Sequence, residues 1–93
     1  MSKGDNLFNK LKYKSIQNEE TIWFQKKENE LTVKDIIFML EEKEISIKTS
    51  FYSEEGTLRK TESTINMEEL EAIYIKCKEL SPIRDKRRLE ELG

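Results

Sequence analysis

The fold of this 93-residue chain depends on how residues 36–48 are interpreted, and these read Ile-Ile-Phe-Met-Leu-Glu-Glu-Lys-Glu-Ile-Ser-Ile-Lys. The first five residues form an uninterrupted apolar run of strand length. Residues 44–48 then alternate between polar and apolar side chains, as a half-buried strand does. The charged residues 41–43 between them fit the turn of a hairpin. The pattern therefore predicts that residues 36–40 and 44–51 form adjacent antiparallel strands.

A helix is the alternative for the same region. Thr32 with Asp35 resembles a capping box, and the apolar residues after it recur at helical spacing. The residues at that spacing are Val33, Ile36, Ile37 and Leu40. Against the helix, Phe38 and Met39 would lie off its apolar face. We favour the hairpin, and a continuous helix from Val33 to Lys43 would contradict this choice.

The flanking segments complete an α+β pattern. Asp5 or Asn6 can cap a short helix over about residues 6–13. Residues 21–27 alternate as a strand, and the Thr-rich residues 57–65, which follow a turn at Gly56, fit an exposed edge strand. We expect an antiparallel sheet of three to four strands, with a short N-terminal helix and a C-terminal helix packed on it, mainly on one face.

The C-terminal helix has the clearest signals. Asn66 is a favourable N-cap, and Glu69 stands three residues later, where it can reach back to the cap. The helix is expected over residues 67–80. Its apolar stripe should face the sheet and consists of Leu70, Ile73, Tyr74 and Cys77.

A break is expected after this helix, because Ser81-Pro82 can end it and start a second one. We therefore divide the chain into one domain, residues 1–81, and a charged helical extension, residues 82–93. The extension has few apolar residues, so truncation after Leu80 should leave a folded domain and weaken partner binding.

A resemblance supports the hairpin. Residues 65–80 read Ile-Asn-Met-Glu-Glu-Leu-Glu-Ala-Ile-Tyr-Ile-Lys-Cys-Lys-Glu-Leu. This segment resembles the closing helix of small uncharacterised accessory proteins encoded by phages and prophages of Gram-positive bacteria. Those proteins open with a short helix similar to residues 6–11, and they carry a hairpin similar to residues 36–47. The resemblance implies a phage origin but no activity and no functional residues. The charged extension and a longer loop at residues 28–34 depart from the pattern.

Composition limits the class of protein. Charged residues make up 39% of the chain and the net charge is −2, far from the basic balance of a dedicated duplex-DNA binder. The charge is uneven: residues 1–14 carry +3, residues 15–81 carry −6 and residues 82–93 carry +1. The polar N-terminus has no apolar run behind it, and the longest apolar run has five residues. We therefore expect no secretory signal, no membrane span and a location in the bacterial host cytosol.

The side chains of common catalytic sites are missing. The chain has no His, one Cys and three Gly, so we expect no catalytic residue, no metal site and no cofactor. The pairs of adjacent glutamates, Glu68-Glu69 among them, fall at turns or caps and are interpreted as solvated. Cys77 is interpreted as a packed core thiol.

The candidate partner-binding residues are aromatic and basic. Trp23-Phe24 and Phe51-Tyr52 each place one aromatic ring away from the core. We expect Phe24 and Phe51 inside, and Trp23 and Tyr52 either at a rim or on an open sheet face that binds a partner. The basic candidates, in the extension, are Arg84, Lys86, Arg87 and Arg88. The alternative for these is a solvated helix face with i,i+4 ion pairs.

These observations favour a non-enzymatic interaction protein of a phage or prophage. We expect it to bind and to inhibit or modulate a bacterial host protein, such as a defence nuclease complex, as a monomer or homodimer. The alternative is an accessory nucleic-acid-binding module. It would use the sheet aromatics together with Lys26, Lys27, Lys48 and the Arg84–Arg88 cluster, and its binding would weaken steeply with salt.

Overall fold

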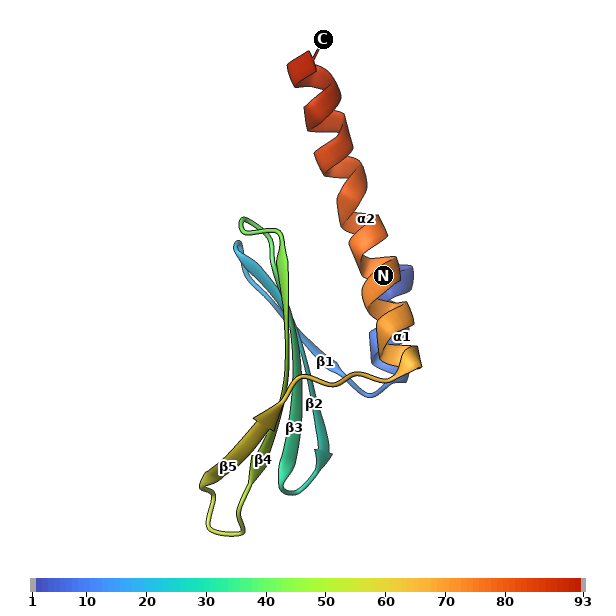
Figure 1. The fold of residues 1–93 in the computed structure, drawn as a ribbon. Helices are drawn as coiled ribbons and strands as arrows, with labels where there is room; N and C mark the ends of the chain where they lie inside the picture. Colours follow the sequence, from blue (N-terminus) through green and yellow to red (C-terminus); the bar gives the residue numbers. More distant parts are fainter. Residues whose placement is uncertain (1, 93) are drawn as a thin grey trace.

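The structure is a computed structural model that describes the backbone of residues 2–92 and the side chains of residues 2–80. In this part of the chain two helices pack on one face of a five-stranded antiparallel sheet, an α+β fold (Figure 1). The strands pair in chain order, β1 to β5. The elements are α1 (Lys3–Lys10), β1 (Lys14–Gln17), β2 (Thr21–Asn29), β3 (Thr32–Met39), β4 (Glu44–Tyr52), β5 (Leu58–Glu62) and α2 (Met67–Leu92).

The hairpin prediction for residues 36–51 is confirmed. β3 and β4 are antiparallel neighbours, with Ile36 opposite Ile47 and Phe38 opposite Ile45. Lys43 takes a φ of 58° in the turn between them. Because side chains alternate across a strand, β3 buries Ile36 and Phe38 on one face, which a helix would have separated. This burial outweighs the capping signal at Thr32.

Both helices lie on the same face of the sheet, over the half that holds the β3–β4 turn (Figure 1). The core forms beneath them, where the rings of Phe8 from α1 and Phe24 from β2 stack at 3.9 Å between centroids. The Phe38 ring meets both edge-on. The buried hydrophobic residues are Phe8, Tyr13, Ile22, Phe24, Ile36, Phe38, Ala72 and Ile73.

The orientation of α2 differs from the prediction. Ile73 is buried and Cys77 packs against the core, as expected. Leu70 and Tyr74 are 46% and 58% exposed, so the expectation that they face the sheet is wrong. The helix is rotated because Glu69 and Lys76, both buried, occupy its inner side. Each forms an ion pair with a residue from a distant part of the chain, and this pair offsets the free-energy cost of burying the charge.

Glu69 anchors the start of α2. Its backbone N–H donates to Oδ1 of Asn66 at 2.8 Å, and the backbone N–H of Asn66 donates to Oε1 of Glu69 at 2.9 Å. The reciprocal capping box predicted from the sequence is thus confirmed. The same carboxylate accepts hydrogen bonds from the Tyr13 hydroxyl and from Lys34 Nζ at 3.0 Å. Glu69 is therefore a buried structural group, and its interpretation as solvated is wrong.

The two helices approach closely at Gly4. A Cβ atom added there would lie 2.7 Å from Oε1 of Glu79 and 3.1 Å from Cα of Lys76. The Gly4 backbone N–H donates to the Glu79 carboxylate, and Lys76 forms a 3.0 Å ion pair with Asp5. A side chain at position 4 would displace these contacts between α1 and α2.

Three boundaries differ from the sequence prediction. The sheet gains β1, an exposed edge strand, so it has five strands rather than three to four. α1 starts at Lys3 because Ser2, not Asp5 or Asn6, is its N-cap and accepts from the Asp5 N–H at 3.1 Å. α2 runs through Ser81-Pro82 to Leu92 without the expected break. Independent folding of residues 1–81 stays a prediction.

Candidate functional site

The face of the sheet opposite the helices is open (Figure 1). Ile22, Phe24, Ile36 and Phe38 point to the helices, so their neighbours in β2 and β3 point the other way. The register places Trp23 between Ile16 of β1 and Ile37 of β3. Ile16 is 47% exposed, and Trp23 and Ile37 are half-buried. We call this row of side chains, Ile16, Trp23 and Ile37, the tryptophan row.

Trp23 is held in place by a side chain of the next strand. Its indole Nε1–H donates to Oδ1 of Asp35 at 2.7 Å, and Nε2 of Gln25 donates to the same oxygen at 3.0 Å. Asp35 and Gln25 are paired across β3 and β2. The two bonds fix the indole ring before any partner arrives, so it loses little rotamer freedom on binding.

Lysines lie on one side of the tryptophan row. Lys14 pairs with Gln25, Lys48 pairs with Asp35, and Lys27 lies further along the same face of β2. All three lysines are exposed. Asp35, which lies among these lysines, already accepts the two hydrogen bonds just described. The open face therefore combines an apolar row with a basic flank on one side.

The other candidate residues do not join Trp23. Tyr52 lies near the far end of β4, where it lines a small groove with Leu31 and Arg59. Tyr52 is six residues along β4 from Ser46, the residue opposite Ile37, a separation of about 20 Å. Phe51 is half-buried, with Lys60 Nζ 4.8 Å from its ring centroid, so its assignment to the core is wrong.

The basic candidates of the extension are only partly placed. Their backbone belongs to α2, which extends beyond the sheet in Figure 1. Their side chains lie outside the described residues, so the role predicted for them is not tested by the structure. These residues are Arg84, Lys86, Arg87 and Arg88.

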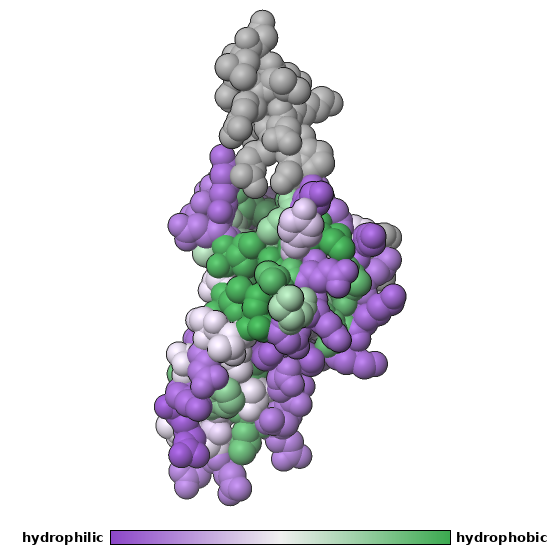
Figure 2. Space-filling view, turned by 45° about the vertical axis from the view of Figure 1, so that its right-hand side comes forward, coloured by the Kyte–Doolittle hydropathy of each residue, from purple (hydrophilic) through white to green (hydrophobic). Residues whose placement is uncertain are grey.

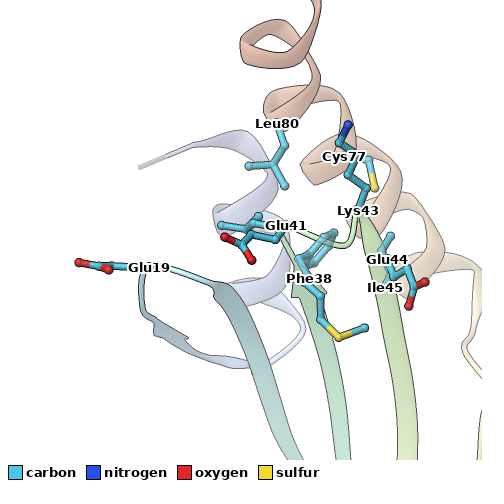
Figure 3. A pocket seen from close by; sticks show the side chains of 10 residues that line it. Glu19, Phe38, Glu41, Lys43, Glu44, Ile45, Cys77 and Leu80 are labelled. Atoms are coloured by element: carbon cyan, nitrogen blue, oxygen red, sulfur yellow. The ribbon is translucent and has the colours of Figure 1, made fainter. Parts of the chain in front are cut away.

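A groove lies on the helix side of the sheet, between α2 and the β3–β4 turn (Figure 3). Its volume is about 780 Å³. Leu80 and Cys77 of α2 face Phe38 of β3 across it. The other apolar lining residues are Met39, Leu40 and Ile45. The groove exists because α1 covers one flank of α2 while no described element covers the flank toward β4.

Acidic residues border this groove. Glu19 comes from the β1–β2 turn, Glu41 from the β3–β4 turn and Glu44 from the start of β4, with Lys43 as the basic exception. We call Glu19, Glu41 and Glu44 the acidic rim. Figure 2 shows apolar side chains gathered where α2 meets the sheet, with hydrophilic ones around them. Cys77, expected in the core, is half-buried and lines the groove as well.

The buried carboxylate of Glu69 has a structural rather than a catalytic setting. Burial by itself would raise the pKa of Glu69, but hydrogen bonds from Tyr13, Asn66 and Lys34 outweigh it and lower the pKa. Burial and the bond to Glu69 raise the pKa of the Tyr13 hydroxyl far above its usual range. Both groups therefore keep their neutral-pH charge states at pH 7, and neither is poised to exchange a proton.

Among the residues the structure describes, none gather in threes or more of His, Cys, Asp or Glu in an arrangement that could hold a metal ion. In the same residues, no helix has the length and apolarity needed to cross a membrane. Comparison with protein families, with characterised proteins and with solved structures gives no match for this chain.

Proposed function

We propose that this protein is a non-enzymatic interaction protein that binds another protein through the open face of its sheet. The observation that carries the proposal is Trp23, which stands on an uncovered face and is fixed by Asp35 at 2.7 Å. Tryptophan is enriched among residues that dominate binding energy at protein interfaces. A ring that is already positioned adds affinity because binding does not have to order it.

The basic flank beside the tryptophan row indicates the chemistry of the partner. Lys14, Lys27 and Lys48 favour a protein surface with acidic residues on one side of an apolar pocket, and this pocket receives the indole ring. Opposite charges at the rim mainly accelerate association and select the partner, whereas the buried ring slows dissociation. The resemblance to phage accessory proteins supports a bacterial host protein as the partner, inhibited or modulated in the host cytosol.

The test uses Trp23 as both probe and target, since it is the one tryptophan of the chain. Partners are captured from bacterial host lysate, purified, and their affinity is measured with wild type and with Trp23→Ala. We expect a loss of at least about 30-fold, the size of an interface hot spot. Tyr74→Ala is the matched control, because Tyr74 is an exposed aromatic residue on α2, away from this face.

Two further variants examine the mechanism. Asp35→Ala removes the acceptor of the indole N–H and should weaken binding less than Trp23→Ala does, through faster dissociation. Lys14→Glu with Lys48→Glu should slow association and remove most of its salt dependence. Equal affinity of wild type and Trp23→Ala would refute the proposal.

Nucleic acid is the competing ligand for the same face, because bases stack on aromatic rings beside lysines. Titration with a fluorescent single-stranded oligonucleotide at several salt concentrations decides between the two. Binding that falls steeply with salt and is lost in Trp23→Ala would overturn the protein-partner proposal.

A further inference from the structure

The groove between α2 and the β3–β4 turn leaves apolar surface of the helix side open to solvent. Ile45 on β4 is 38% exposed and Leu70 on α2 is 46% exposed, on the flank that α1 does not reach. Ile45, Phe38, Cys77 and Leu80 line the groove, and Leu70 lies two helical turns before Cys77 on α2; we call these five residues the apolar strip. Contiguous exposed apolar surface bordered by polar residues is typical of an interaction site.

The acidic rim indicates what kind of segment covers this strip. Glu19 and Glu41 lie at the tips of two neighbouring turns, and each is followed by a second glutamate in the sequence. The tips are joined, since the Leu40 N–H donates to the Glu20 carbonyl oxygen at 2.9 Å. An occupant that is apolar on one side and basic on the other would satisfy both the strip and the rim.

The C-terminal part of α2 carries both basic and apolar residues. Residues 82–92, which we call the arm, read Pro-Ile-Arg-Asp-Lys-Arg-Arg-Leu-Glu-Glu-Leu. The five residues from Arg84 to Arg88 hold four bases and one acid. Apolar residues that can meet the strip stand on both sides of this cluster, namely Ile83, Leu89 and Leu92. The arm therefore offers the groove both apolar residues and a basic cluster, Arg84 to Arg88.

The continuity of α2 decides which arm reaches which groove. α2 is one helix from Met67 to Leu92, so Leu92 lies about 18 Å beyond Leu80 along its axis. In Figure 1 this end of the helix extends away from the sheet. A straight helix therefore carries the arm away from the groove of its own chain, while the arm of another chain can enter without any break at Pro82.

We propose that the groove receives the arm of a second copy of this chain, so that two chains exchange arms in a two-fold symmetric dimer. Each chain gives one arm and accepts one, and this reciprocity closes the assembly at two copies. The exchange covers the apolar strip on both chains. It uses the helix side of the sheet and leaves the tryptophan row of each chain free, so it is independent of the proposed function.

The test reverses charge separately on the two sides of the contact. A rim-reversed chain carries Glu19→Lys and Glu41→Lys, and an arm-reversed chain carries Arg87→Glu and Arg88→Glu. Each variant alone opposes like charges at both contacts, so its self-association should weaken at least about tenfold in sedimentation velocity. When the two variants are mixed, opposite charges face each other at both contacts. The mixture should therefore form a dimer that contains one chain of each kind.

A matched control and a chemical probe complete the experiment. Glu54→Lys with Glu55→Lys reverses an exposed acidic pair at the β4–β5 turn, away from the groove, and should leave the dimer intact. Cys77 is the one cysteine of the chain, so a thiol reagent reports on the groove alone. Its labelling should slow as wild-type concentration rises through the dimer dissociation constant.

Other results overturn the proposal. A monomer at all concentrations, or a dimer that neither reversal weakens, excludes arm exchange. A monomer whose Cys77 reacts faster after truncation at Leu80 means that the arm folds back on its own groove. A dimer lost in Trp23→Ala but kept in both reversed chains means that the open sheet face is the interface between copies.

Discussion

Replacing Glu69 by Gln removes one charge from the buried network that holds α2 on the sheet. The side chain is 1% exposed and accepts hydrogen bonds from Tyr13, from Lys34 and from the backbone of Asn66. Gln keeps the shape and one acceptor oxygen, so the bond from Asn66 can survive. The bonds from Tyr13 and Lys34 lose their ionic partner.

The expected loss follows from these bonds. A hydrogen bond to a charged group contributes about 1.5–3 kcal/mol, whereas a neutral one contributes about 1 kcal/mol. In Glu69→Gln the bonds from Tyr13 and Lys34 become neutral-acceptor bonds or are lost. Lys34 keeps Glu28 at 3.7 Å as a weaker partner. We expect the free energy of unfolding to fall by about 2–3 kcal/mol, a large part of the stability of a domain of this size.

The measurement is urea unfolding at pH 7, followed by Trp23 fluorescence and far-UV circular dichroism. Glu68→Gln is the matched control, since Glu68 is the exposed neighbour in the same turn and should change stability by less than about 0.5 kcal/mol. If Glu69→Gln and Glu68→Gln have the same unfolding midpoint, the network does not hold α2 as described.

The same pair of proteins tests the pKa of Glu69. The folded-state pKa is lower than the ordinary glutamate value of 4.5, so the carboxylate contributes its full stabilisation above pH 4.5. That contribution disappears as the pH falls through the folded-state pKa. Wild type should therefore lose its advantage over Glu69→Gln in acid, and parallel pH curves for the two proteins would contradict this explanation.

Three further outcomes are expected. Gly4→Ala should destabilise the protein by about 1–3 kcal/mol, because the added Cβ would lie 2.7 Å from the Glu79 carboxylate. A variant as stable as wild type would mean that α1 and α2 are less close. Ile73→Ala should lower the free energy of unfolding in urea by about 2–5 kcal/mol and Leu70→Ala by less than about 1 kcal/mol, because only Ile73 is buried. The reverse order would mean that Leu70 faces the sheet, as the sequence predicts. In an alkaline ultraviolet titration Tyr13 should ionise only as the protein unfolds, because its pKa is raised in the folded state. The stability that the neutral hydroxyl provides is lost as the pH rises above 10. A normal titration of all tyrosines would contradict the buried hydrogen bond.

The hairpin and the start of α2 could be predicted because their signals are local. The β3–β4 strands follow from an apolar run, a charged turn and an alternating segment within 16 residues. The Asn66–Glu69 capping box lies within four residues. In both patterns the interacting residues are close in the sequence, so the sequence alone is sufficient to predict their contacts.

The rest depends on partners that are far apart in the chain. Glu69 is buried because Tyr13 and Lys34, 56 and 35 residues away, meet it. Lys76 turns inward to Asp5 for the same reason, and the two together rotate Leu70 outward. β1 was not predicted because all four of its residues are exposed, so its sequence does not need the polar–apolar alternation of a half-buried strand.

The candidate site was also predictable only in part. Adjacent aromatic residues in a strand require one to point outward, but the sequence left Trp23 either at a rim or on an open sheet face, and only the strand register shows the second. The position of Asp35 at the indole Nε1–H depends on the register between β2 and β3, which the sequence leaves open. Pro82 removes one backbone hydrogen bond donor, but this does not prevent α2 from continuing.

The chain-order pairing of the strands has a consequence for how the protein folds. Each strand pairs with the next one along the chain, so the sheet can grow hairpin by hairpin without closing a long loop. The large closure is the docking of α1 on α2, which joins Gly4 to Glu79 across 75 residues. We expect the transition state to contain the central β3–β4 hairpin, with the helices docking afterwards. Substitutions between the helices should then accelerate unfolding and leave the rate of folding nearly unchanged.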